Sequence, residues 1–118
     1  GEKNIIPYDK ILILTNKYTM SSAELLTYSL ILSNDNAYMI GKDTYRKNIG
    51  QTSLYDKRTN IIFSFSAFEW RINEKSVEQL YEEAIIKKKI IEIDEGSDYN
   101  DYMKKAYFEI NKNNKLTI

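Results

Sequence analysis

The 118-residue sequence predicts an α/β fold, and three observations carry this prediction. An apolar run at 10–16 (KILILTN) is followed by a helical segment and then by a second apolar run at 37–41 (AYMIG). Continuous apolar character is typical of strands that are covered on both faces, as in parallel sheets. The strand-helix-strand order calls for a right-handed crossover between parallel strands. We therefore expect one compact α/β unit.

The segment between the two apolar runs is predicted to be a helix over about 21–33. Ser21 and Glu24 fit the S-x-x-E capping box, which satisfies free N–H groups at a helix start. The residues SNDN at 33–36 are turn formers that end the helix. We expect the helix to be buried around much of its girth, because it contains Leu25, Leu26, Tyr28, Leu30, Ile31 and Leu32.

A polar stretch at 42–53 leads into a predicted β-hairpin that turns at 56–60. In the second arm, successive side chains are expected to point to opposite faces of the strand. One face would carry Ile62, Ser64 and Ser66, and the other Ile61, Phe63, Phe65 and Ala67. Clustered aromatic side chains usually belong to a sheet core, and a neutral chain favours that role over stacking on nucleic acid. We expect a core role for Phe63, Phe65, Phe68 and Trp70.

The last third of the sequence predicts a helix at 76–89, a short strand at 89–93 and an amphipathic helix at 98–113. The basic run Lys87–Lys89 is expected to be a solvated helix end. The acidic segment 94–101 lacks the spacing of a calcium loop, so we expect an exposed turn and helix start. The apolar stripe of the final helix is predicted to comprise Tyr102, Met103, Ala106, Tyr107 and Ile110.

Composition excludes several classes of function. Lysine and arginine number 17, as do aspartate and glutamate, so there is no basic excess to favour nucleic acid or an anionic membrane. No apolar run is long enough to span a bilayer. No leader pattern begins the sequence, so a signal for export would lie upstream of it.

Missing residue types narrow the chemistry further. Without cysteine there is no disulfide, thiolate nucleophile or cysteine metal site within this chain. Without histidine there is neither a Ser-His-Asp triad nor a His-rich zinc site, and we expect no cofactor and no metal. A nucleophilic serine would need another base, and lysine, which burial can make a proton acceptor, is the obvious candidate.

Three pieces of the sequence together resemble a known family. The pieces ILILTN, SSAE and IGKDTYRKNIGQ are similar to the pattern V-L-V/I-N, S-A-x-E and I-G-x-x-T-F/Y-G-K-G-x-x-Q of the C-terminal processing (tail-specific) serine proteases. The resemblance runs from about Lys10 to Trp70, and the late DYNDYMKKA resembles more weakly the closing helix of that family. It implies a Clp protease/crotonase-like β-α-β spiral core with a β-hairpin and a closing C-terminal helix.

The resemblance also implies a site and an activity. Ser21 corresponds to the nucleophile, Lys47 to its general base and Gln51 to the residue that orients the lysine. The backbone N–H of Ser22 would donate to the oxyanion, and Glu24 would cap the helix. The implied function is that of a serine endopeptidase that hydrolyses peptide bonds in proteins or peptides.

The same resemblance implies that the chain is a partial domain. Residues 1–9 would be a linking segment and 10–118 the C-terminal part of a peptidase catalytic domain. The implied partners are a protein or peptide substrate, the upstream half of the catalytic domain and a PDZ domain in the parent protein, and the implied location is the cell envelope or the extracellular space. The upstream half would supply part of the substrate groove, so the isolated chain is not expected to cleave.

Two departures from the family pattern leave alternatives open. Arg46 and Asn48 replace the glycines that flank the lysine, and a gapless alignment from the serine puts Arg46 in place of the base. Arginine cannot act as a base, whereas choosing Lys47 keeps the match to Gln51. One alternative is an inactive relative that binds peptides or partner proteins. Another is an acyl-CoA enzyme of the crotonase fold, for which the sequence has no CoA-binding signature.

Overall fold

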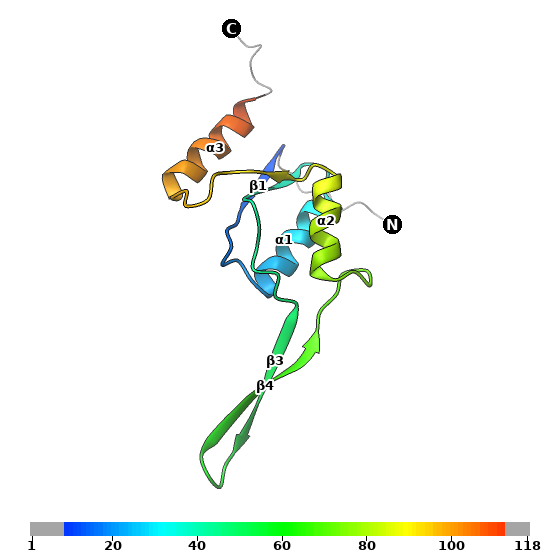
Figure 1. Ribbon diagram of the computed structural model, residues 1–118, viewed down its shortest axis with the longest axis vertical. Coiled ribbons are helices and arrows are strands. Elements are labelled where there is room, and N and C mark those ends of the chain that lie inside the picture. Colours follow the sequence, from blue (N-terminus) through cyan, green and yellow to red (C-terminus); the bar gives the residue numbers. More distant parts are fainter. Residues whose placement is uncertain (1–8, 113–118) are drawn as a thin grey trace.

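The computed structural model of the chain describes residues 9–112 and is mixed α/β, as predicted (Figure 1). Of the predicted linking segment 1–9, all but the last residue lies outside the described residues. The elements follow the predicted order: β1 (Ile11–Leu14), α1 (Ser22–Ser33), β2 (Ala37–Ile40), β3 (Ile49–Asp56), β4 (Ile61–Glu69), α2 (Val77–Ile86), β5 (Ile90–Ile91) and α3 (Tyr99–Asn111).

The central sheet has three parallel strands in the order β1-β2-β5. In the register of β1 and β2, Ile11 lies opposite Ala37 and Leu14 opposite Ile40, so the predicted parallel pairing of the two apolar runs is confirmed. Within the described residues, β2 is the one strand of this sheet that is covered on both faces, as its buried residues indicate. The same expectation for β1 is wrong within the described residues, because Ile11, Leu12 and Ile13 are only partly buried and Leu14 is 40% exposed.

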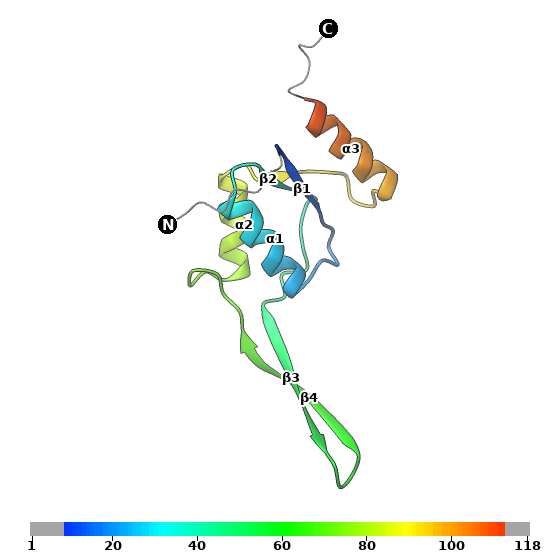
Figure 2. The same ribbon diagram turned by 180° about the vertical axis from the view of Figure 1, so that it is seen from behind.

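The helices lie on two sides of this sheet. In Figures 1 and 2 the strands lie between α3 and the pair formed by α1 and α2, and α1 packs against both β2 and α2. The core forms between that pair and the sheet, where burial of each large apolar side chain contributes roughly 1.5–3 kcal/mol. The fully buried members of this cluster are Tyr28, Ile31, Ala37, Met39, Val77, Leu80 and Ala84.

Two predictions about helix burial hold only in part. Helix α1 fully buries one stripe, Leu25, Leu30 and Leu32 are partly buried beside it, and Leu26 is 62% exposed. In α3, Ala106 is buried as expected, but Tyr107 and Ile110 of the predicted stripe are exposed. Packing of α3 is limited mainly to contacts with β2, so Tyr102 and Met103 are partly buried while Tyr107 and Ile110 are uncovered.

Local signals place the helix starts correctly. Ser76 and Gln79 form a capping box at α2, and the Asp98 carboxylate accepts a hydrogen bond from Asp101 N (2.9 Å) at α3. The acidic segment is therefore a turn and helix start, as predicted. The basic run is an exposed end only in part, since the Lys89 amine donates to the carbonyl oxygens of Asn34 and Asp35 after α1 and of Ala37 at the start of β2 (2.9–3.2 Å).

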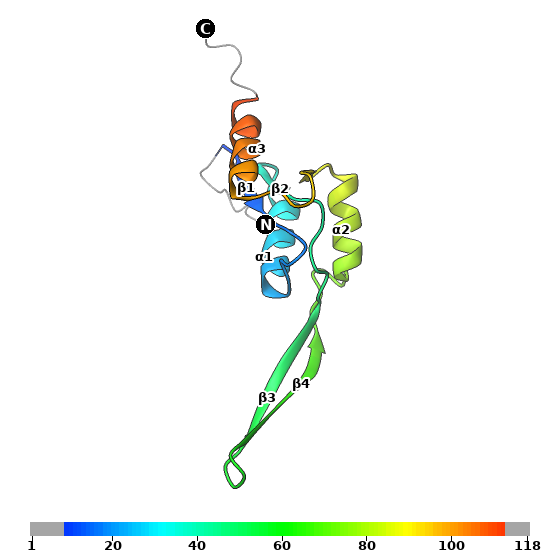
Figure 3. The same cartoon turned by 60° about the vertical axis from the view of Figure 1, so that its left-hand side comes forward.

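The hairpin of β3 and β4 extends away from the rest of the molecule (Figure 3). It turns where predicted, pairs from Ile49 opposite Glu69 to Asp56 opposite Ile61, and contains a bulge at Gly50. The molecule consequently measures 72 × 39 × 25 Å, so the prediction of one compact unit is wrong for the hairpin.

The predicted aromatic sheet core is also wrong within the described residues. Phe63, Phe65 and Phe68 are 46–58% exposed, and only Trp70 packs against the core. Their strands form a two-stranded sheet, so no third strand or helix covers the aromatic face in the part of the chain that the structure describes. None of the helices within 9–112 has the length and apolar character needed to cross a membrane.

Candidate functional site

Ser21 lies at the turn that enters α1 and has an unusual backbone conformation. Its φ is +56° and its ψ is −121°, whereas a helix-capping residue ordinarily has a negative φ. In this conformation the Ser21 hydroxyl makes no capping hydrogen bond. The main-chain N–H of Ser21 instead donates to Glu24 Oε2 (2.8 Å), which is the reciprocal half of a capping box.

The main-chain N–H of Ser22, the next residue, is free within the described residues. Ala23 N donates to Met20 O (3.2 Å) and Leu25 N to Ser21 O (3.0 Å), but the N–H of Ser22 has no acceptor among residues 9–112. A free N–H at a helix start carries part of the positive end of the helix dipole. A donor suited to a developing oxyanion therefore adjoins the Ser21 side chain.

Lys47 belongs to the loop at 41–48 that joins β2 to β3, and Glu24 binds this loop at three points. Thr44 Oγ1 donates to Glu24 Oε1 (2.6 Å), the N–H of Arg46 donates to the same oxygen, and the N–H of Lys47 donates to Oε2 (2.9 Å). Glu24 itself is fully buried. Its carboxylate thus compensates burial of its charge with four hydrogen bonds, counting the one from the helix start.

These contacts bring the main chains of Ser21 and Lys47 together. Both N–H groups donate to one oxygen atom, at 2.8 Å and 2.9 Å, so the two nitrogens are at most 5.7 Å apart, the sum of these distances. A second link joins the preceding residues, since Tyr45 N donates to Thr19 O (2.8 Å). The turn before α1 and the lysine loop are therefore held as one unit.

Tyr28 supports this arrangement from beneath. Its hydroxyl shares a hydrogen bond with Thr44 Oγ1 (3.2 Å), which in turn donates to Glu24. Burial is the main cause that raises the pKa of Tyr28 to about 12, and the nearby Glu24 charge acts in the same direction. The phenol consequently stays neutral and remains able to donate.

Arg46 is committed to contacts away from the serine. Its Nε and Nη2 both bind Asp43 at 3.0 Å, its Nη1 binds Glu78 at 2.7 Å, and the guanidinium lies 4.1 Å from the centre of the Tyr81 ring. Burial lowers the pKa of Arg46, but the bonds and charges of Asp43 and Glu78 outweigh it and the net pKa is raised. The φ of Arg46 is +63°, the left-handed region that glycine adopts most easily.

The predicted third residue is not assembled with the other two. Gln51 is exposed on β3, opposite Ser66. In the described part of the chain, no hydrogen bond joins the Lys47 amine to Ser21 or to Gln51. Trp70 Nε1 donates to Lys47 O (3.2 Å), so the main chain of Lys47 is fixed on both sides, while its amine has no hydrogen-bond partner among residues 9–112.

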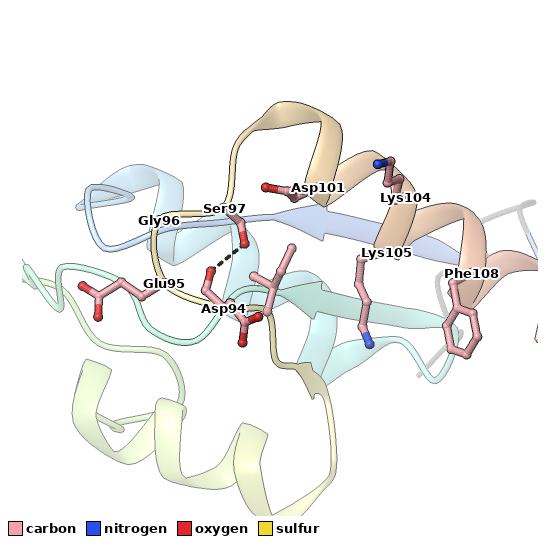
Figure 4. Close-up of a pocket in the computed structure, with 9 residues that line it drawn as sticks. Asp94, Glu95, Gly96, Ser97, Asp101, Lys104, Lys105 and Phe108 are labelled. Atoms are coloured by element: carbon pink, nitrogen blue, oxygen red, sulfur yellow. Dashed lines mark hydrogen bonds between the residues drawn. The ribbon is translucent and has the colours of Figure 1, made fainter.

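Hollows lie near the carboxyl ends of the parallel strands, where α/β proteins commonly bind ligands. One of about 590 Å³ is lined by the residues that follow β1, β2 and β5. Another, of about 580 Å³, lies between segment 93–97 and α3, where Ser97 Oγ donates to Asp94 O at 2.6 Å (Figure 4). A smaller one, of about 280 Å³, includes Thr19, but Ser21, Lys47 and Gln51 line none of these three.

Sequence reasoning assigned Glu24 only a local capping role and missed Thr44 and Tyr28. A signal was available, because Glu24, Tyr28 and Ile31 recur at the spacing of one helix face, and Tyr28 and Ile31 are apolar residues suited to a core. A carboxylate on a core-facing stripe must find buried donors.

No group of acidic side chains within 9–112 is arranged to hold a metal ion. Comparisons of the chain with protein-family models, with curated proteins and with solved structures find no match. The candidate site therefore consists of a strained serine at a helix start, a free N–H beside it and a lysine whose main chain is bound to the same carboxylate.

Proposed function

We propose that this chain carries the catalytic residues of a serine endopeptidase, with Ser21 as the nucleophile and Lys47 as its general base. The observation that carries the proposal is the backbone of Ser21, a non-glycine residue with positive φ at the end of the loop 15–21 between β1 and α1. Such strain clusters at functional sites, and a sharp turn before a helix is a known way to present a nucleophilic hydroxyl.

The proposed chemistry uses groups that the described structure leaves free. The neutral amine of Lys47 takes the proton of the Ser21 hydroxyl as its oxygen attacks the peptide carbonyl carbon. The N–H of Ser22 donates to the oxyanion, and the lysine then passes its proton to the leaving amine. Water hydrolyses the resulting acyl-enzyme, with the same amine as base.

Two further observations support the choice of Lys47. Arg46, the competing residue, is bound to Asp43 and Glu78, and it has no proton-accepting form in proteins. Its positive φ agrees with an alignment that sets it opposite a glycine of the tail-specific proteases. In that alignment Gln51 would orient the Lys47 amine once both side chains turn toward Ser21.

The finer fold and the setting of the chain belong to the same proposal. The β-α-β unit with its serine at the helix start is compatible with a Clp protease/crotonase-like spiral. A protein or peptide substrate, an upstream half of the catalytic domain, a PDZ domain and a cell-envelope or extracellular location follow from the resemblance.

A second candidate is an inactive relative that binds peptides or partner proteins. The observation that favours it is the absence, within 9–112, of a hydrogen bond from the Lys47 amine to Ser21 or Gln51. In that case the strained backbone of Ser21 would serve only to set the direction in which α1 leaves the preceding loop.

The test uses the full-length protein that contains this chain and an unstructured protein as substrate. Ser21→Ala and Lys47→Ala should each lower the cleavage rate by about 10³-fold or more, since each removes a reacting group. Ser22→Ala and Lys42→Ala are matched controls, because the first keeps the oxyanion N–H and the second removes an exposed lysine. Folded wild type without cleavage, or a Ser21→Ala variant as fast as wild type, would favour the inactive relative.

A further inference from the structure

We propose that Glu24 is a positioning residue. Its buried carboxylate fixes the turn that carries Ser21, here called the nucleophile turn, relative to the lysine loop at 41–48. This inference rests on the proposed function and assigns Glu24 a role beyond capping its own helix. Capping alone requires one contact, the hydrogen bond from Ser21 N to Oε2. The other three donors come from Thr44, Arg46 and Lys47, at least twenty residues further along the chain.

The carboxylate is suited to this task because it only accepts hydrogen bonds. Oε2 receives the N–H groups of Ser21 and Lys47, while Oε1 receives Arg46 N–H and Thr44 Oγ1. Glutamine has nearly the same shape, but one of its two terminal atoms is a donor. Whichever way the amide faces, two of the four donors would then meet N–H groups instead of an acceptor.

The lysine loop has supports other than Glu24. Tyr28 of α1 binds Thr44, and the Arg46 side chain binds Glu78 of α2. Loss of Glu24 would therefore leave the loop attached to the body of the protein, but joined to the turn before α1 only by the hydrogen bond from Tyr45 N to Thr19 O within the described residues. The lysine would remain near the serine without a fixed approach to its hydroxyl.

A displaced base affects the chemical step more than substrate binding. Misplacement of a catalytic group by about 1 Å can cost roughly 10²-fold in rate. Because Glu24 is fully buried, it does not contact a substrate. Glu24→Gln should therefore lower kcat by about 10²-fold while KM changes by less than about threefold.

The experiment compares Glu24→Gln with Thr27→Val in the full-length protein. Thr27 is a matched control, since it is buried on the same face of α1 and, among the described residues, its hydroxyl bonds only to Ala23 O (2.7 Å). Three quantities are measured: kcat and KM for peptide cleavage, the rate at which a fluorophosphonate probe labels Ser21, and hydrogen exchange of the amides at 44–47. We expect slower turnover, slower labelling and faster exchange in Glu24→Gln alone.

Several results would overturn the positioning role. They are an unchanged kcat in Glu24→Gln, an equal loss of kcat in Thr27→Val, and a change confined to KM. If Glu24→Gln does not fold, Thr44→Val decides, because it removes one donor and leaves the carboxylate in place. That variant should lower kcat by about tenfold with KM unchanged, and an unchanged kcat would refute the role.

Failure of the proposed function gives a different pattern. Ser21→Ala would then cleave as fast as the wild type, or the wild type would not cleave, and the positioning role would fall with it. Failure of the positioning role alone leaves Ser21→Ala inactive and Glu24→Gln as fast as the wild type.

Discussion

The lysine loop and the hairpin are consecutive along the chain, yet they are held in very different ways. Loop 41–48 has no regular structure, but side chains of α1 and α2 bind it from two sides. Strands β3 and β4 have a regular ladder, yet nearly all of their side chains are exposed within the described residues. Regular hydrogen bonding and tertiary support are thus separate properties, and the candidate site lies where the support is.

The largest expected effect is a difference between two leucines. Leu80 in α2 is 1% exposed and Leu54 in the hairpin is 60% exposed. Leu80→Ala should lower the free energy of unfolding by about 2–5 kcal/mol, because it leaves a cavity in the core. Leu54→Ala should lower it by less than about 0.5 kcal/mol, because little of its apolar surface is buried. Urea denaturation measures both.

Equal losses of unfolding free energy for Leu80→Ala and Leu54→Ala would contradict this difference between the core and the hairpin. A large loss for Leu54→Ala would mean that another part of the protein covers the hairpin in solution. Leu26→Ala provides a control in the body of the molecule, since Leu26 in α1 is 62% exposed and should behave like Leu54.

The second prediction concerns stability at alkaline pH. The pKa of Tyr28 is raised from 10.0 to about 12, mainly by burial, so the unfolded chain loses this proton before the native protein does. The stabilisation is therefore complete below pH 10 and is lost as the pH rises toward 12, a change of about 3 kcal/mol.

Tyr28→Phe should remove this part of the pH dependence. Its free energy of unfolding, measured by urea denaturation from pH 9 to pH 12, should fall less steeply than that of the wild type. Ile31→Val is the control, since it alters the same cluster without a titrating group and should run parallel to the wild type. Parallel curves for wild type and Tyr28→Phe would contradict the burial of the phenol.

The element order could be predicted from the sequence because each signal is local. Apolar runs with turn formers between them mark the strands, and an amphipathic pattern marks α3. Parallel pairing followed from the helix between the two runs. These features depend on residues within one or two turns of each other.

The exposure of the hairpin could not be predicted in the same way. Alternation shows which side chains share a face, and the alternation of Phe63 and Phe65 with Ser64 is correct. It does not show whether another element lies against that face. The role of Glu24 could not be predicted for a similar reason, because three of its four donors depend on the path of a loop at least twenty residues away.

The third prediction contrasts two glycines. A Cβ at Gly41 would lie 2.7 Å from the carbonyl oxygen of Thr15, which is main chain fixed by the hydrogen bond from Thr15 N to Ile40 O. A Cβ at Gly50 would lie 1.9 Å from the ring of Phe68, whose side chain is exposed and can rotate away. Gly41→Ala should cost about 1–3 kcal/mol and Gly50→Ala less than about 1 kcal/mol.

Thermal or urea denaturation of the two alanine variants measures this contrast. A larger loss of stability for Gly50→Ala than for Gly41→Ala would show that the Phe68 ring is held in place. That result would contradict the exposure of the hairpin.

The smallest expected effect comes from an ion-pair cluster on α2. Glu83 binds Lys75 (2.5 Å) and Lys87 (2.8 Å), and these hydrogen bonds, that with Lys75 first, lower the pKa of Glu83. Because the pKa of Glu83 is lower in the folded protein than in the unfolded chain, ionised Glu83 stabilises the fold at pH values above its unfolded pKa. This stabilisation is lost as the pH falls through the folded pKa. The lysines are half exposed, so solvent screening limits the contribution to less than about 1 kcal/mol.

Glu83→Gln should therefore be slightly less stable than the wild type at pH 7 and equal to it once both states are protonated, near pH 2. The neighbouring Glu82→Gln is the control, because Glu82 is exposed and forms no ion pair in the described part of the chain. A loss in Glu83→Gln that exceeds 2 kcal/mol would contradict the solvent screening. It would mean that α2, which also binds Arg46 of the lysine loop through Glu78, is stabilised by charge as much as by its buried face.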